Sequence, residues 1–143
     1  MLKFSYSVKG DQIFIEGLNP GTKYTFAVQA IHQNGNVSAA FSVKATTAKY
    51  TAVKSLKKTM ATTDSVTLSW KPSTAPAQTV GYVIEVYDST GKILLDTVSI
   101  TDAGTTTYTI PELSAGTKYT FVVRATDGKH QSLAAKVKVA TVK

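Results

Sequence analysis

The chain repeats a ten-residue segment almost unchanged, and this repeat limits what it can fold into. Residues 21–30 read GTKYTFAVQA and residues 116–125 read GTKYTFVVRA, so eight of ten positions are identical at an offset of 95. The match extends upstream at the same offset, where Ile15 corresponds to Ile110. A period near 95 residues is far longer than a solenoid repeat and suits a β-sandwich of about 100 residues. We therefore expect two related β-domains in tandem.

The two copies have unequal lengths. The second copy begins near Thr51, so the first copy lacks a counterpart for about 45 residues at its start. Downstream of the repeat, the offset of 95 pairs Ala39-Ala40 with Ala134-Ala135 and Ala45-Thr46 with Ala140-Thr141. The expected organisation is a partial module at 1–47, a linker at 48–50 and a complete module at 51–143. A linker this short cannot act as a free coil, which predicts modules held roughly end to end.

The second copy shows short runs in which apolar and polar residues alternate. Val66, Leu68 and Trp70 fall on one face of such a run, and Lys71-Pro72-Ser73 then ends it, because proline cannot donate to a β-ladder. This pattern predicts seven strands and no helix. The predicted strands are Val53–Met60, Ser65–Trp70, Gly81–Asp88, Lys92–Ile100, Thr106–Ile110, Lys118–Asp127 and Ala134–Val142.

The first copy supplies fewer strands, and the apolar face they share has nothing obvious to cover it. We expect strands at Gln12–Leu18, Lys23–His32 and Ala39–Thr46, preceded by a short strand at Lys3–Val8. Each large apolar side chain that stays exposed to solvent loses roughly 1.5–3 kcal/mol of the stabilisation that burial would give. Something should therefore cover this face, and the candidate assembly residues are Ile13, Ile15, Phe26, Val28 and Phe41.

The sequence around the repeat resembles a fibronectin type III domain. The segment Leu113-Ser-Ala-Gly-Thr-Lys-Tyr119, which follows Thr-Tyr-Thr-Ile, is similar to the E–F corner of that family. The resemblance implies that Tyr119, and Tyr24 in the first copy, pin a corner through their hydroxyls. It also implies a structural core that includes Trp70, Tyr82 and Leu113 in the complete module and Leu18 in the partial one.

The resemblance implies an all-β fold, with one complete seven-stranded immunoglobulin-like sandwich plus the C-terminal half of another. The segment Gly35-Asn36-Val37-Ser38-Ala39-Ala40 resembles the F–G hairpin of bacterial members, which often belong to secreted glycoside hydrolases and cell-surface proteins. We therefore expect an extracellular location. The N-terminus lacks the apolar core of a signal peptide, so we expect that any export signal has been removed or belongs to a longer precursor.

Composition excludes several classes of protein and site. There is no cysteine, which excludes disulfides and thiolate metal sites. No apolar run approaches the roughly 20 residues that span a membrane. The formal net charge is +7, but Lys57-Lys58 is the only adjacent pair of basic residues. Nucleic-acid binding needs a denser stripe, so lysines that protect exposed strand edges are the preferred interpretation. A mild attraction to anionic cell-wall polymers or acidic glycans remains reasonable.

The titratable residues do not form a convincing active site. Ser132, His130 and Asp127 could be drawn as a triad, but all three fall on one hairpin with no sign of a buried base. Glu16, Glu85 and Glu112 are scattered, which argues against a paired-carboxylate hydrolase. His32 and His130 are interpreted as exposed loop histidines rather than metal ligands. We expect no enzyme activity and no cofactor.

Two short motifs have a simpler structural interpretation. Lys9-Gly10-Asp11 resembles an integrin-binding tripeptide, but glycine before aspartate also suits a tight turn into a strand. Asn36-Val37-Ser38 fits the N-glycosylation sequon, which matters only in a eukaryotic secretory pathway.

Most aromatic residues are assigned to core faces by the alternation. Two tyrosines are expected to face outward and could stack on a sugar. They are Tyr50, at the junction, and Tyr87, whose side chain should face away from those of Tyr82 and Val86.

Three functional hypotheses remain open at this stage. The first is a non-catalytic extracellular spacer or interaction module whose partners are neighbouring modules. The second is a subunit of an extracellular homo-polymer, in which strands of a neighbouring chain complete the partial module. The third is an accessory glycan-binding module of a carbohydrate-active enzyme.

Overall fold

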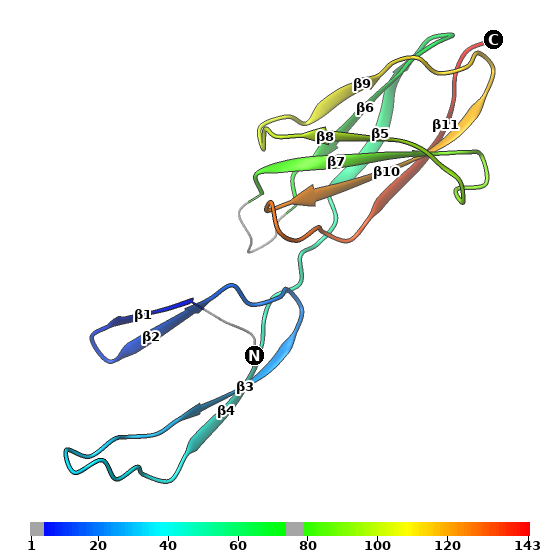
Figure 1. The fold of residues 1–143 in the computed structure, drawn as a ribbon. Coiled ribbons are helices and arrows are strands. Elements are labelled where there is room, and N and C mark those ends of the chain that lie inside the picture. Colours follow the sequence, from blue (N-terminus) through cyan, green and yellow to red (C-terminus); the bar gives the residue numbers. More distant parts are fainter. Residues whose placement is uncertain (1–4, 74–78) are drawn as a thin grey trace. The chain divides into compact units, whose positions relative to one another are not determined.

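A computed structural model describes residues 5–73 and 79–143, and every helix or strand assigned in these ranges is a β-strand (Figure 1). The chain divides into two compact units, which cover residues 1–49 and 50–143. The described residues contain no helix that is long and apolar enough to cross a membrane. The all-β class expected from the alternation is confirmed.

The second unit is a sandwich of two antiparallel sheets (Figure 1). One sheet has the strand order β5-β6-β9 and the other has the order β11-β10-β7-β8. The strand bounds fall within two residues of those expected from the sequence, because alternation and turn residues both mark them. The strands are β5 (Lys54–Ala61), β6 (Val66–Lys71), β7 (Gly81–Tyr87), β8 (Leu94–Ile100), β9 (Thr107–Ile110), β10 (Lys118–Thr126) and β11 (Ala135–Ala140).

The core of the second unit lies between these sheets. The alternating residues of β6, β7 and β10 face inward, and their apolar side chains are buried. Trp70 packs edge-on against Tyr82, with ring centroids 5.2 Å apart. The Tyr82 hydroxyl donates to the carbonyl of Ala103 at 3.1 Å, so the ring is fixed at both ends. The largest fully buried side chains are Tyr82, Phe121, Leu68, Ile84, Ile110, Val66, Val86 and Val123.

Strand β5 forms one edge of its sheet and is irregular. Its register with β6 shifts between Lys54 and Lys57 and again between Lys58 and Met60. Ser55 adopts a φ of 53°, the left-handed region that non-glycine residues rarely occupy. Bulges and exposed lysines both discourage another strand from pairing with such an edge. Lys57 and Lys58 lie exposed on this edge strand, where their protective role stays a prediction.

The first unit consists of two hairpins (Figure 1). Strand β1 (Ser5–Lys9) pairs with β2 (Gln12–Glu16), and β3 (Lys23–Val28) pairs with β4 (Phe41–Thr46). Residues 3 and 4 of the expected first strand lie outside the described residues. Lys9 pairs with Gln12 across a two-residue turn, and Gly10 there has a φ of 63°. A positive φ at the first turn position defines a turn type that favours glycine, so Lys9-Gly10-Asp11 has a structural explanation.

The structure corrects the alignment of the two copies beyond the repeat. The Thr47 hydroxyl donates to the carbonyl of Asn19 at 2.6 Å, and the Thr141 hydroxyl donates to that of Ser114 at 2.6 Å. Asn19 and Ser114 are 95 residues apart, whereas Thr47 and Thr141 are 94 apart. The expected pairing of Ala39-Ala40 with Ala134-Ala135 is therefore wrong by one residue, as is that of Ala45-Thr46 with Ala140-Thr141. The cause is one extra residue in the loop between β3 and β4.

Candidate functional site

Both units close the corner before their repeated strand with the same hydrogen bond. The Tyr119 hydroxyl accepts from the backbone N–H of Ser114 at 2.9 Å, and the Tyr24 hydroxyl accepts from that of Asn19 at 2.9 Å. Tyr119 is buried, whereas Tyr24 is half-buried. Leu113 packs against the core of the second unit, and Leu18 is half-buried in the first. The tyrosine-corner geometry implied by the sequence resemblance is present in both units.

Removing the corner hydroxyl is expected to loosen the second unit. We predict that Tyr119→Phe costs about 1–2 kcal/mol of local stability, because the Ser114 N–H loses its acceptor beside a buried ring. Native-state amide exchange checks this, since the Ser114 amide should then exchange at least about tenfold faster. Tyr108→Phe, which removes a hydroxyl from β9 away from the corner, is the matched control. Equal exchange rates at Ser114 in both variants would contradict the prediction.

Large apolar side chains of the first unit lie exposed. Phe41 is 75% exposed, and Val28 and Ile13 are each 55% exposed. The equivalents of Tyr24, Phe26 and Val28 in β10 are Tyr119, Phe121 and Val123, all of which are buried. We refer to the five candidate assembly residues, Ile13, Ile15, Phe26, Val28 and Phe41, as the unit 1 apolar face. Within it Phe26 is half-buried and Ile15 is 36% exposed.

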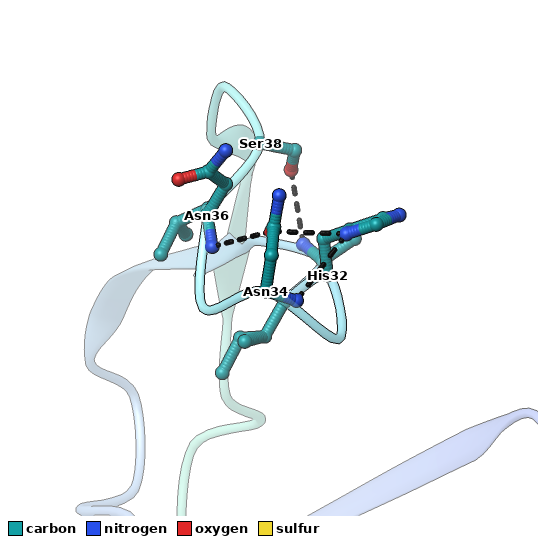
Figure 2. A pocket seen from close by; sticks show the side chains of 7 residues that line it. His32, Asn34, Asn36 and Ser38 are labelled. Atoms are coloured by element: carbon teal, nitrogen blue, oxygen red, sulfur yellow. Dashed lines mark hydrogen bonds between the residues drawn. The ribbon is translucent and has the colours of Figure 1, made fainter.

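The loop between β3 and β4 lines a shallow cavity of about 520 Å³, to which both apolar and polar side chains contribute (Figure 2). His32 Nδ1 lies 2.9 Å from Asn34 Oδ1, which also accepts from the backbone N–H of Asn36 at 3.1 Å. The Ser38 hydroxyl accepts from the backbone N–H of Ala30 at 2.9 Å. These polar groups are used to hold the loop's own shape. The side-chain amide of Asn36, the asparagine of the sequon, points away from the hydrogen-bonded groups in Figure 2.

Asp127, His130 and Ser132, the residues considered as a catalytic triad, lie on one hairpin, but the Ser132 hydroxyl hydrogen-bonds to backbone groups. His130 Nδ1 lies 3.0 Å from Asp127 Oδ2. Ser132 is buried, and its hydroxyl accepts from the Ala125 N–H and donates to the Leu133 carbonyl. This serine therefore secures the loop between β10 and β11. Across residues 5–73 and 79–143, no group of three or more His, Cys, Asp or Glu side chains is arranged to hold a metal ion.

Tyr50 was expected to face outward, and the structure shows that this expectation is wrong. Tyr50 is only 3% exposed and belongs to the core of the second unit. Its hydroxyl lies 3.1 Å from the Thr79 hydroxyl, and its carbonyl accepts from the Leu133 N–H at 3.0 Å. Burial is the largest cause of the raised pKa of this phenol. Tyr50 anchors the start of the second unit and offers no platform for a ligand.

Tyr87 lies near the end of β7 and is half-buried, so part of its ring reaches the surface. Its hydroxyl donates to Glu85 Oε2 at 3.1 Å. Arg124 Nε lies 3.8 Å from the same carboxylate oxygen. Desolvation and the neighbouring Glu85 carboxylate both raise the pKa of Tyr87. Of the two aromatic candidates, Tyr87 alone retains an accessible ring.

A serine at the base of each of these two loops forms a polar clasp, a pair of hydrogen bonds to one alanine, that was not predicted from the sequence. Ser38 and Ser132 each bind a backbone N–H through their hydroxyls, at Ala30 and Ala125 respectively. The same two serines also donate their backbone N–H groups to the carbonyls of these alanines. Aligning the two copies with an offset of 94 residues after the repeat would have matched Ser38 with Ser132.

Comparison with known families gives a match that covers most of the second unit. Residues 51–138 match the family described as "Fibronectin type III domain". Among curated proteins, Chitinase A1 of Niallia circulans is 41% identical over 130 residues, which is 85% of this chain and 17% of that protein. Tenascin of Gallus gallus is 32% identical over 111 residues, covering 78% of this chain and 6% of tenascin. The chain thus spans less than a fifth of either relative.

Solved structures show the same fold. A two-domain fibronectin type III segment of chicken tenascin aligns with a TM-score of 0.61 and 23% identity, over 90% of this chain and 71% of that structure. The fibronectin type III domain of the human collagen alpha-1(XX) chain aligns with a TM-score of 0.57 and 24% identity, over 66% of this chain and 87% of that structure.

Proposed function

The chain belongs to the fibronectin type III family, and from that premise we propose that it is a non-catalytic extracellular module. Its role is to space, orient and link functional neighbours within a secreted or surface-attached bacterial protein. The supporting observation is the match to Chitinase A1, in which the matched stretch makes up only 17% of a larger enzyme. A stretch of this kind fits an accessory module better than a catalytic unit.

The side chains support a structural role. The hydroxyls of Tyr119, Thr141 and Ser132 all bind backbone groups of their own unit. Ser132 and Asp127, two of the residues considered as a triad, both stabilise the hairpin between β10 and β11. Asp127 does so by accepting from the backbone N–H groups of Lys129 and His130. These are the contacts of a rigid framework.

The exposed unit 1 apolar face favours a second candidate, which is assembly. In the second unit, the equivalent residues of β10 belong to one buried core together with residues of β6 and with Tyr50 and Val53. A neighbouring chain cannot donate strand β6 from its own second unit without opening the core around Trp70 and Phe121. The partner available in a pure solution is therefore the same face of a second copy, which would produce a symmetric dimer.

Light scattering separates the two candidates. We expect the purified chain to have a molar mass of 15.3 kDa that does not change over a hundredfold range of concentration. A mass that rises with concentration would overturn the purely passive role and support assembly. In that case, replacing Phe41 and Val28 together with serine should restore the monomer, since both side chains are exposed. A matched pair, Leu94→Ser with Leu95→Ser on β8, should leave the dimer intact.

A further inference from the structure

A small cavity of about 220 Å³ opens on the outer face of the β11-β10-β7-β8 sheet. The middle of its floor is β10, where Thr120 pairs with Tyr87 of β7 on one side and Lys138 of β11 on the other. Val122 of β10 also lines it, and Thr90 and Gly91 of the turn between β7 and β8 form its rim. Drug-sized ligands occupy roughly 300–1,000 Å³, so this cavity suits a smaller molecule such as a single sugar ring.

The charge around the cavity favours an anion. Arg124, Lys136 and Lys138 line it, and Glu85 is the carboxylate among the lining residues. Glu85 is already shared between the Tyr87 hydroxyl at 3.1 Å and Arg124 Nε at 3.8 Å. The exposed Lys136 and Lys138 are therefore left to attract a negative group. Cations that converge on one small surface hollow bind a carboxylate through charge-assisted hydrogen bonds.

A buried hydroxyl in the cavity floor has no partner. Thr120 is 4% exposed, and its Oγ1 makes no hydrogen bond within the described structure. Buried hydroxyls are normally hydrogen-bonded, because leaving one unpaired costs stability. Gly91 lies directly over this hydroxyl, since a Cβ added there would be 3.5 Å from Thr120 Oγ1. Thr120 Oγ1 therefore lies at the edge of the cavity, next to the rim residue Gly91.

The rim of the cavity is held in place by Asp88. Its carboxylate accepts from the Thr90 hydroxyl at 2.7 Å and from the backbone N–H of Lys92 at 3.1 Å. The hydrogen bond from Thr90 is the largest cause of the lowered pKa of Asp88. A rim fixed in this way presents Thr90 and Gly91 to the cavity without the entropic cost of ordering a loop on binding.

We infer that this cavity binds the uronic acid unit of an acidic polysaccharide. The sugar carboxylate is held by Lys136, Lys138 and the free donors of Arg124. A sugar hydroxyl satisfies Thr120 Oγ1, and the apolar ring face rests on Tyr87. This inference goes beyond a spacing role and does not depend on it, because it concerns a ligand site within the second unit alone.

An NMR titration of the ¹⁵N-labelled full chain tests the inference. The probes are trigalacturonate and, as a neutral sugar of the same length, maltotriose. We expect saturable shifts with trigalacturonate at the amides of Gly91, Thr120 and Val122, and none with maltotriose. Saturation by inorganic phosphate at the same concentration as trigalacturonate would overturn the assignment to a sugar, as would equal binding of maltotriose.

Paired charge variants separate a specific site from general attraction to a basic protein. Lys136→Gln with Lys138→Gln should weaken trigalacturonate binding at least tenfold. Lys57→Gln with Lys58→Gln removes the same charge from β5 in the other sheet and should change the affinity less than twofold. Equal losses in the two double variants would overturn the proposed site.

Thr120→Val distinguishes a ligand group from a packing defect. The substitution removes the unpaired hydroxyl at nearly constant volume, so thermal stability should be equal or higher. Affinity for trigalacturonate should nevertheless fall at least threefold. A variant that is stabilised but binds trigalacturonate unchanged would show that the hydroxyl has no part in recognition.

Discussion

Phe121→Ala is expected to destabilise the second unit by about 3–5 kcal/mol, because the ring is fully buried and its removal leaves a cavity between the sheets. That loss is a large part of the roughly 5–15 kcal/mol that holds a typical domain together. Trp70 is the only tryptophan and lies in the same core, so its fluorescence reports this unit alone. The urea midpoint followed at Trp70 should fall by at least about 1 M.

The internal repeat supplies a matched control for this experiment. Phe26 occupies the equivalent position of β3, but it is only half-buried. Phe26→Ala removes the same atoms from the first unit, whose stability Trp70 does not report, so we expect the Trp70 midpoint to stay within experimental error. A midpoint that falls equally in both variants would show that the loss is not specific to the core around Phe121.

Gly81→Ala should be comparably damaging for a different reason. A Cβ built at Gly81 would lie 1.9 Å from the carbonyl oxygen of Ile100, which is a backbone atom that cannot turn away. The clash would force β7 apart from β8 beside the buried Tyr82. We expect a loss of about 3 kcal/mol, the upper end for an overpacked core. For a unit of this size, the melting temperature should then fall by roughly 12–24 °C.

Gly104→Ala is the control for the glycine substitution. A Cβ there would meet the Asp102 carboxylate at 3.2 Å, and that side chain can move. Its effect should stay within about 0.5 kcal/mol, as for most surface changes. If Gly81→Ala melted no earlier than Gly104→Ala, the close approach of β7 to Ile100 would be refuted.

The strands were predictable because their alternation and their turns agree. In β6, three buried residues alternate with polar ones, and Lys71 ends the strand just before Pro72. The tyrosine corner was predicted from the family resemblance, which the repeat carries into both units, and its hydroxyl lies only five residues from the N–H that it binds.

The predictions that were wrong or missing concern residues whose contacts come from distant parts of the sequence. Tyr50 is buried because Thr79 and Leu133 meet it, and neither lies within its own segment. The cavity around Thr120 was missed because four segments build it, and alternation assigns Thr120 simply to an outer face. An unpaired hydroxyl is a property of three-dimensional packing that no sequence period reveals.

The serine clasp fixes the register of the strands on either side of each loop, whatever the length of that loop. Ser38 and Ser132 each bind both backbone groups of an alanine, although one loop holds one residue more than the other. Because the clasp ends each loop in the same way, an insertion within the loop need not shift the strands. The segment between Ala30 and Ser38 is thus a natural place to graft foreign peptides, and the same tolerance would let evolution diversify it freely.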